Sequence, residues 1–389
     1  MKIAIVGGGP SGLYLALLIK KRLADAEVVV HEQNAADATF GFGVVMADSG
    51  LNRLAEADQP SCDALTAAMH FNYAQDIVQR DTPICVARDD RGGAIARLKL
   101  LEILQGQCRA AGVTLRFGIP LPSTDVLEDA DLIVGADGAN SLVRREREAE
   151  FGTTRRFLNN RFAWYGTQRR FDIPALVFRE FEGGYYIAHY YPYDDNMSTF
   201  VGECDAGTWT RCGLDVMSDD ERQHLFERIF APELRNMPLI SNKSAWRQFP
   251  VVQNRHWSVG KRVLIGDALA SAHFSIGSGT RIAMEDAIVL ADALARHRDS
   301  VPAALAAFET QRRPEKAKLL DAAERSFDWY ERIAEWMEMF EPLDFVYAFM
   351  TRTGRINDER MRKQFPQFME MVDVQRARQA AAETVSDAP

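Results

Sequence analysis

The chain lacks a long apolar run, an excess of positive charge and a cysteine-rich segment, and each absence excludes a class of protein. No uninterrupted apolar run reaches the ~18 residues of a membrane-spanning helix, so we expect no membrane span. The 46 Lys and Arg residues stand against 55 Asp and Glu residues, a net charge of −9, which disfavours nucleic-acid binding because phosphates need a basic face. Hydrophobic residues still make up 47 %, which excludes global disorder.

The five cysteines are scattered, at positions 62, 85, 108, 204 and 212. An odd number without a CxxC pair predicts neither a disulfide framework nor a metal site. We therefore expect no bound metal and a reducing, cytoplasmic location. The apolar start of the chain superficially resembles a secretory signal, but residues 7–12 include four glycines and a proline, which disfavours the helical apolar segment that a signal needs.

A glycine-rich segment follows the first predicted strand, residues 3–6, and opens a helix. Gly7, Gly9 and Gly12 satisfy the G-x-G-x-x-G pattern, in which glycines allow a tight turn and bring a pyrophosphate close to a helix N-terminus. Glu32 lies about twenty residues further on, where a carboxylate binds ribose hydroxyls and disfavours a 2′-phosphate. The pattern predicts a dinucleotide site and does not separate NAD from FAD; the alternative is a glycine-rich turn without a ligand.

Two further carboxylates come directly after buried strands. Asp137 follows the apolar run 131–134, and Asp267 follows the run 262–265. Open α/β sheets bind ligands at this end of their strands, although an Asp in such a place more often caps a helix. The glycine-rich segment, Asp137 and Asp267 each follow a predicted strand. Three such features in one chain favour a shared ligand site over coincidence more strongly than a single one would.

In this order, the three motifs resemble those of the FAD-dependent aromatic hydroxylases, the single-component (group A) flavoprotein monooxygenases. The resemblance covers most of the chain and implies an α/β fold, with a Rossmann-like FAD-binding domain, an inserted antiparallel-sheet substrate domain and a helical C-terminal region. It implies FAD as cofactor, NADH or NADPH as a transient co-substrate, and O2. It also implies hydroxylation of an aromatic ring through a flavin C4a-hydroperoxide. A second G-x-G-x-x-G pattern is absent, which disfavours a reductase with two dinucleotide sites.

The resemblance assigns roles along the chain. Arg97 matches an arginine that contacts the phosphate and ribityl region of FAD, and Asp267 would bind the ribityl chain. Segment 40–45 matches the loop beside the isoalloxazine ring, and segment 273–281 matches the loop and helix start that face the flavin. The implied cofactor-binding residues are Gly7, Gly9, Ser11, Gly12, Glu32, Gly43, Val44, Arg97, Asp137, Asp267, Gly279, Thr280 and Arg281.

The substrate is expected on a sheet in the middle of the chain, between residues 161 and 203. Segments rich in aromatic and β-branched residues, separated by turns, predict antiparallel strands there. Only alternate side chains of a strand can face a pocket, and the sequence does not say which half does. His273 is the predicted catalytic residue, a base that takes the proton of a phenol. The predicted substrate contacts are Phe274, Ser275, Tyr165 and His189.

The predicted domains follow from these segments. They are an FAD-binding domain at 1–155 with 256–300, a substrate-binding sheet domain at 156–255, a helical region at 301–378 and a disordered, small and polar tail at 379–389. The predicted helices of the C-terminal region are 302–310, 314–336, 342–351 and 357–376, three of which begin with a proline.

Shorter segments are similar to the aryl-CoA hydroxylases, which act on salicylyl-CoA or anthraniloyl-CoA; segment 345–355 favours this group. The similarity implies 5-hydroxylation of a thioester such as salicylyl-CoA, and the arginine pairs 144–145, 155–156 and 169–170 are candidates for its phosphates, or ordinary surface charge. One alternative is hydroxylation of free tryptophan or another indole, as in violacein biosynthesis. Another is an FAD-binding electron-transfer protein without hydroxylation. A halogenase lacks support because its tryptophan-containing motif is absent, and the oligomeric state stays open.

Overall fold

The computed structural model describes residues 1–39, 41–242, 244–277 and 279–386, and it divides into two compact units. Unit 1 contains residues 1–69, 93–158 and 249–323. Unit 2 contains residues 70–92, 159–248 and the chain from residue 324 onward. The predicted α/β fold class, with a parallel nucleotide-binding sheet, a second sheet and C-terminal helices, is confirmed.

Unit 1 holds a six-stranded sheet with the strand order β14-β15-β7-β1-β2-β6. All of its paired strands are parallel except β14, which is antiparallel to β15. The elements of unit 1 are β1 (Lys2–Val6), α1 (Pro10–Arg22), β2 (Glu27–His31), β3 (Gly43–Ala47), α2 (Asp48–Ala57), α3 (Gln59–Thr66), α4 (Arg97–Ala110), β6 (Thr114–Arg116), the 3-10 helix η1 (Thr124–Leu127), β7 (Leu132–Gly135), α5 (Leu142–Arg145), α6 (Glu148–Phe151), β14 (Ser258–Val259), β15 (Arg262–Leu264), α10 (Gly266–Leu269), the 3-10 helix η2 (Phe274–Ile276) and α11 (Gly279–Arg296).

The first strand and helix explain how this unit forms. Every residue of β1 after Lys2 is buried, as expected of a central parallel strand covered on both faces. Helix α1 is buried from Pro10 to Ile19 and packs against α4 and α11. Because β1 lies between β2 and β7, the strand order reverses at β1, and doubly wound sheets bind ligands outside the carboxyl ends of the strands at such a point.

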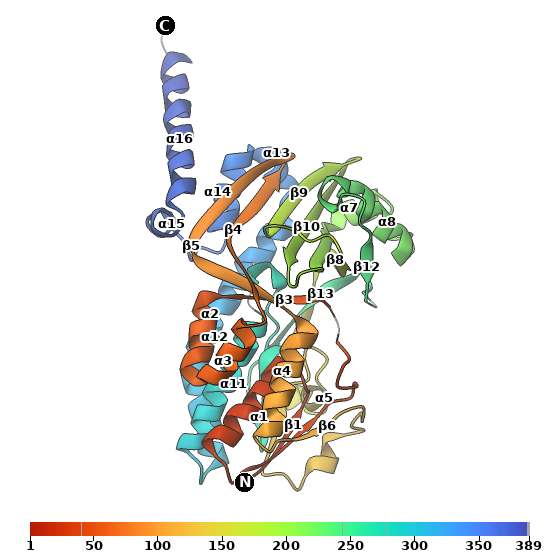
Figure 1. Ribbon diagram of the computed structural model, residues 1–389, viewed down its shortest axis with the longest axis vertical. Helices are drawn as coiled ribbons and strands as arrows, with labels where there is room; N and C mark the ends of the chain where they lie inside the picture. Colours follow the sequence, from red (N-terminus) through yellow and green to blue (C-terminus); the bar gives the residue numbers. More distant parts are fainter. Residues whose placement is uncertain (40, 243, 278, 387–389) are drawn as a thin grey trace. The chain divides into compact units, whose positions relative to one another are not determined.

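Unit 2 is built around a mixed sheet in which strands distant in sequence lie side by side, in the order β12-β8-β11-β10-β9-β4-β5 (Figure 1). Its elements are β4 (His70–Gln79), β9 (Ala175–Phe181), β10 (Gly184–Pro192), β11 (Ser198–Cys204), α7 (Ala206–Arg211), α8 (Asp219–Ile229), α9 (Ala231–Leu234), β12 (Leu239–Ser241), α13 (Ile333–Met339), α14 (Pro342–Thr351), α15 (Asp358–Gln364) and α16 (Pro366–Ser386). Four elements contain residues of both units, namely β5 (Thr82–Ala96), β8 (Thr153–Thr167), β13 (Arg247–Asn254) and α12 (Val301–Glu331).

Different helices cover the two faces of the unit 2 sheet. On one face, Tyr186 of β10 packs edge-on against Phe226 of α8, with their ring centroids 5.6 Å apart. On the other face, Phe178 of β9 packs against Phe345 of α14 at 4.9 Å. The C-terminal helices therefore belong to the core of unit 2 and do not form a separate body.

Two boundaries of the predicted domains differ from the units of the structure. Residues 70–92 belong to unit 2, because β4 pairs in parallel with β9, with Asp76 opposite Ala175. Strand pairing depends on partners distant in sequence, which local patterns do not reveal. The predicted C-terminal region is also divided, since α12 up to residue 323 is part of unit 1.

Several helix ends differ from the predictions, and α12 ends at Glu331 where residue 336 was predicted. Helix α12 continues through Pro314 instead of breaking before it, although proline removes one helical hydrogen bond. The neighbours Arg312 and Lys316 are buried in ion pairs that hold this stretch of chain in place. The predicted helix 357–376 is interrupted at Phe365, between α15 and α16. The tail predicted to be disordered is helical to Ser386, since a run of alanines favours helix.

Among the described residues, none of the helices combines the length and apolar character needed to cross a membrane. Within the same residues, no group of three or more His, Cys, Asp or Glu side chains could hold a metal ion.

Candidate functional site

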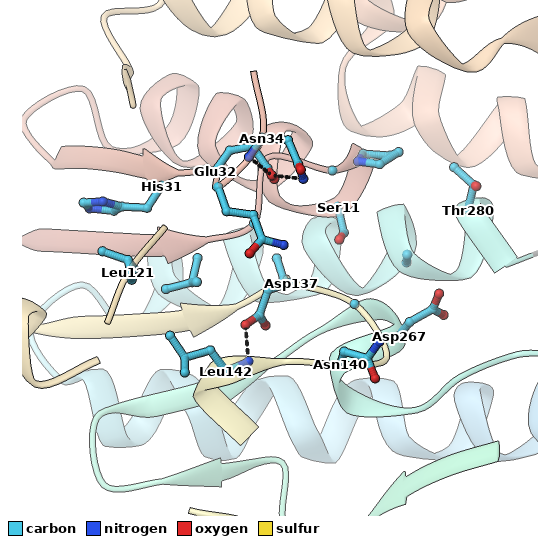
Figure 2. A pocket seen from close by; sticks show the side chains of 18 of the residues that line it. Ser11, His31, Glu32, Asn34, Leu121, Asp137, Asn140, Leu142, Asp267 and Thr280 are labelled. Carbon is cyan, nitrogen blue, oxygen red and sulfur yellow. Dashed lines mark hydrogen bonds between the residues drawn. The ribbon is translucent and has the colours of Figure 1, made fainter. Parts of the chain in front are cut away.

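A cavity of about 520 Å³ in unit 1 opens where β1, β2, β7 and β15 end. In Figure 2, His31 and Leu121 lie at one end, Asp267 and Thr280 at the other, and Glu32 and Asp137 between them. Of the predicted cofactor residues, those that line the cavity are Gly7, Gly9, Ser11, Glu32, Arg97, Asp137, Asp267, Gly279 and Thr280. An elongated cavity with separated polar groups suits an extended ligand such as a dinucleotide.

Sequence reasoning missed several of the residues that line the cavity. They include His31, Asn34, Ile119, Leu121, Asn140 and Arg145. Ile119 and Leu121 follow β6, which pairs with β2. Ile119 and Leu121 could have been predicted from the rule that loops after parallel strands line ligand sites. The strand before them, β6, has only three residues and gives no clear strand pattern in the sequence.

The glycine loop shows why this turn needs glycine at two positions. Gly7 has φ +110°, and a Cβ there would lie 2.4 Å from the carbonyl oxygen of Ala136. A Cβ on Gly12 would lie 2.1 Å from the carbonyl oxygen of Gly7. Gly12 does not line the cavity; its role is to let β1 and α1 approach each other closely. No side chain of the described residues caps the N-terminus of α1. That terminus borders the cavity and favours an anion.

Glu32 holds the glycine loop from the end of β2. One carboxylate oxygen accepts a hydrogen bond from the Gly8 N–H at 2.8 Å, and the other accepts from the backbone and side-chain nitrogens of Asn34 at 2.8 and 2.7 Å. A carboxylate at this place can bind hydroxyl groups, which donate, and repels phosphate.

Asp137 combines a structural and a ligand-facing position. Its Oδ2 accepts from the Leu142 N–H at 2.6 Å and so caps α5 (Figure 2). This is the helix-capping role considered for the motif. Its Oδ1 is buried and has no hydrogen-bond partner among the described residues, and desolvation raises the pKa of this carboxyl group. A buried acceptor beside a cavity indicates that a ligand donor belongs there.

Asp267 lies near Thr280 at the opposite end of the cavity (Figure 2). Its side chain is exposed to the cavity, although the surrounding protein atoms desolvate the carboxyl and raise its pKa. The charges of Lys316 and Arg97 act in the opposite direction. These two cations therefore help Asp267 to stay ionised, as an acceptor for hydroxyl groups.

In the loop predicted to face a flavin, His273 makes a contact that bears on its predicted role as a base. Its Nδ1 accepts from the Ser275 N–H at 3.2 Å and caps η2, and the ring is only 3 % exposed between Phe249 and Phe274. This bond assigns the neutral ring a proton on Nε2. A ring in that form donates from Nε2 and cannot accept a proton there, so a donor role fits better than a base. Ser278 of this loop lies outside the described residues.

Besides Gly12, three predicted cofactor residues do not line the cavity. Gly43 and Val44 belong to β3, and Val44 is buried. The segment before them is tied to the site through the main chain, since the Arg97 N–H donates to the Phe42 carbonyl at 2.7 Å, while Phe40 lies outside the described residues. Arg281 instead pairs with Glu285 at 2.6 Å.

In unit 2 the structure separates Tyr165 and His189, which the sequence grouped as substrate contacts. Tyr165 is in the core on the face covered by α7–α9; its hydroxyl accepts from Trp246 Nε1 at 2.9 Å, and burial raises its pKa to about 12. His189 lies on the opposite face, stacked on Tyr330 with centroids 5.5 Å apart. The two side chains cannot line one pocket, and Tyr165 acts as a core residue.

His189 has a buried carboxylate partner that the sequence did not reveal. Its Nε2 lies 3.1 Å from Oε2 of Glu203 on the adjacent strand β11, and Glu203 also accepts from Asn160 Nδ2 at 2.8 Å. Within the part of the chain that the structure describes, the Oδ1 of Asn160 and the hydroxyl of Tyr330 are buried without a hydrogen-bond partner. No motif marks Glu203, because its role depends on strand register.

Comparisons with known proteins decide the family. A family model described as FAD binding domain matches residues 121–323. The chain is 40 % identical over 366 residues to salicyloyl-CoA 5-hydroxylase from Streptomyces sp, covering 91 % of this chain and 70 % of that protein. It is 33 % identical to 3-hydroxy-4-methyl-anthranilyl-[aryl-carrier protein] 5-monooxygenase from Streptosporangium sibiricum, covering 92 % and 95 % of the two chains. The chain belongs to the FAD-dependent aromatic monooxygenases.

A solved structure agrees with the fold of this monooxygenase. The structure of 2-methyl-3-hydroxypyridine-5-carboxylic acid oxygenase matches with a TM-score of 0.72 at 20 % identity, covering 90 % of this chain and 95 % of that one. The predictions of a flavoprotein aromatic hydroxylase that uses FAD, NAD(P)H and O2 are confirmed at the level of the family.

The cavity of the monooxygenase fits FAD. The uncapped N-terminus of α1 suits the pyrophosphate, Glu32 and Asp267 offer acceptors to hydroxyl groups at separate places, and the orphaned Oδ1 of Asp137 is available to a donor. Arg97, at the start of α4, adds a cation at the cavity wall.

The cavity residue His31 is expected to make the apo-monooxygenase acid-sensitive. Burial, and secondarily the charge of Arg116, lower the pKa of His31 below its value in the unfolded chain. Between the two pKa values the unfolded state binds more protons, so stability decreases as pH falls through about 6.5 and below. We expect His31→Gln to flatten the pH dependence of the urea midpoint from pH 7.5 to 5.5. An unchanged slope in this variant would assign the acid sensitivity to other groups.

Proposed function

We propose that this monooxygenase hydroxylates the ring of an aromatic acid bound to CoA as a thioester, such as salicylyl-CoA, at position 5. The similarity to salicyloyl-CoA 5-hydroxylase over nine-tenths of the chain carries the proposal. The name of the second relative also describes an aromatic acyl group on a carrier and attack at position 5. The competing substrate class is an indole, because the chain is 33 % identical to protodeoxyviolaceinate monooxygenase from Chromobacterium violaceum.

The residues of unit 1 have separate tasks in this proposal. FAD, when bound, would supply the activation of O2 with electrons from NADH or NADPH, so that one atom of O2 enters the ring and the other leaves as water. The N-terminus of α1 would hold the pyrophosphate, and Glu32 and Asp267 would hold hydroxyl groups. The N-terminus of the 18-residue helix α11, at Gly279 and Thr280, would stabilise negative charge on a flavin ring placed near it. His273 donates from Nε2, and Phe249 and Phe274 beside it exclude water.

The arginine pairs do not all remain candidates for CoA phosphates. Arg144 is fully buried and donates to the Ala268 carbonyl at 2.9 Å, so it cannot reach a phosphate, and Arg145 lines the cofactor cavity. This leaves residues 155–156 and 169–170. We also propose a cytoplasmic location, supported by the absence of disulfide bonds between the five cysteines, all of which are among the described residues.

The experiment that tests the proposal measures NADH and NADPH oxidation by the FAD-loaded protein with four compounds. Salicylyl-CoA, anthraniloyl-CoA, free salicylate and tryptophan are added in turn, and products are identified by mass. We expect the thioesters to stimulate oxidation at least 10-fold and to gain one oxygen, while salicylate mixed with free CoA does neither. Hydroxylation of tryptophan alone would replace the proposal with the indole class. No stimulation by any compound, with FAD bound, would favour the electron-transfer alternative.

A further inference from the structure

Asp286 of α11 contacts the turn at Gly266 where β15 leads into α10 and Asp267, and we call this turn the Asp267 loop. Its Oδ2 accepts a hydrogen bond from the Gly266 N–H at 2.9 Å, and Gly266 directly precedes the cavity residue Asp267. The Asp286 side chain is 0 % exposed and does not line the cavity. Asp286 therefore acts on the cofactor site through the backbone, from behind it.

Two buried cations of α12 hold the Asp286 carboxylate. Arg312 Nε lies 2.9 Å from Oδ1, and Lys316 Nζ contacts Oδ2, the same oxygen that binds the Gly266 N–H. Both cationic side chains are 0 % exposed. Burying three charges is unfavourable unless they are paired and fully hydrogen-bonded, so the geometry of this cluster leaves little freedom to its members. The orientation of Asp286 is thereby set by α12.

The same cluster reaches the other wall of the cavity. Arg312 Nη2 also lies 2.8 Å from Oε2 of Glu285 and donates to the Ile282 carbonyl at 3.2 Å. Glu285 pairs in turn with Arg281, which follows the cavity residues Gly279 and Thr280. One set of buried ion pairs thus ties the Asp267 loop and the first turn of α11 together.

We propose that the buried cluster of Asp286, Arg312 and Lys316 is a positioning device for the cofactor. It fixes Asp267 and the N-terminus of α11 at the separation that FAD requires, and so sets the affinity for FAD, although none of its members touches the cavity. Asp286 is the central member because it alone bonds both the Asp267 loop and the two cations. Helix α12, whose residues do not line the cavity, is through this cluster part of what makes unit 1 bind its cofactor.

The test compares FAD affinity with the stability of the apoprotein in Asp286→Asn. The asparagine amide has the shape of the carboxylate but lacks its negative charge, so Arg312 and Lys316 no longer hold the side chain in one orientation. The Gly266 N–H then has no acceptor fixed in place. Apoprotein well below its unfolding temperature is titrated with FAD, and unfolding of the apoprotein is measured separately. We expect the Kd for FAD to rise at least 10-fold. Glu315→Gln serves as the control, because Glu315 contacts Arg312 at 3.1 Å from the half-exposed side and makes no bond to the loop; its Kd should stay within 2-fold of wild type.

The outcomes separate a positioning role from a structural one. A Kd for Asp286→Asn within 3-fold of wild type, in a folded apoprotein, would overturn the proposal whatever happened to its unfolding temperature. An equal rise of the Kd for FAD in Glu315→Gln would also overturn the proposal. It would mean that any substitution around Arg312 weakens FAD binding, whether or not it affects the contact with Gly266. If Asp286→Asn does not fold, Arg312→Lys decides, because it keeps a buried cation and the Gly266 contact but removes the Nε–H that holds Oδ1 of Asp286. A rise of 3-fold or more supports the proposal, and a smaller one overturns it.

Discussion

Gly12→Ala is expected to abolish stable FAD binding. The added Cβ would lie 2.1 Å from the carbonyl oxygen of Gly7, a distance that no relaxation of a side chain can relieve because the obstacle is backbone. The loop or the start of α1 must move, and the pyrophosphate site moves with it. We expect the Kd for FAD to rise more than 100-fold, about 2.7 kcal/mol. The purified variant should lack flavin absorbance, and titration of the apoprotein with FAD measures the loss.

Two other glycine variants serve as controls for this result. Gly106 is exposed in the interior of α4, and a Cβ added there would meet no atom within 4 Å, so Gly106→Ala should leave FAD binding unchanged and stabilise the fold by about 0.4–1 kcal/mol. A Cβ on Gly9 also meets no protein atom, but Gly9 lines the cavity. Gly9→Ala should therefore fold normally and weaken FAD binding. Stoichiometric FAD in purified Gly12→Ala would refute the steric argument.

The parts of the site predicted well from the sequence are those that local chain geometry specifies. The segment from Gly7 to Gly12 needs its glycines because strand, turn and helix follow one another within a few residues, and Asp137 and Asp267 come directly after buried strands. Patterns at this range are visible in the sequence without any knowledge of tertiary contacts. The same reasoning predicted antiparallel strands between residues 161 and 203, where β9, β10 and β11 lie, and a helix start within segment 273–281, where α11 begins at Gly279.

The parts that could not be predicted depend on partners far away in the chain. Tyr165 and His189 were grouped because both lie in aromatic strands, but register and the direction of each strand place them on opposite faces. Glu203 and Asp286 carry no motif at all; each gains its role from one contact across the fold, with His189 and with the Gly266 N–H. A helix break was predicted before Pro314 because proline disfavours helix interiors. In the structure, the buried ion pairs of Arg312 and Lys316 on either side of Pro314 outweigh that disfavour.

His273→Ala is expected to retain FAD but to lose the coupling of NAD(P)H oxidation to hydroxylation. The substitution removes both the cap on the Ser275 N–H and the Nε2–H donor. Loss of one well-placed donor in a site of this kind costs on the order of 10²-fold in the coupled rate. Product and H2O2 formed per NAD(P)H consumed, with the thioester as substrate, measure the coupling. Product in the wild-type ratio would mean that His273 has no part in the reaction.

Two conservative variants tell the capping, donor and base roles of His273 apart. Asparagine can still accept from the Ser275 N–H but has no donor where Nε2 lies, whereas glutamine can place an amide N–H near that point and does not cap. If donation is the role, His273→Gln recovers part of the coupling and His273→Asn does not. If only the hydrogen bond from the Ser275 N–H matters, because it shapes the loop, His273→Asn recovers part of the coupling and His273→Gln does not. A base would show itself differently, as an acidic limb of the pH–rate profile present in wild type and absent from His273→Gln. Since Nδ1 is held by the Ser275 N–H, we expect the two enzymes to share the same acidic limb.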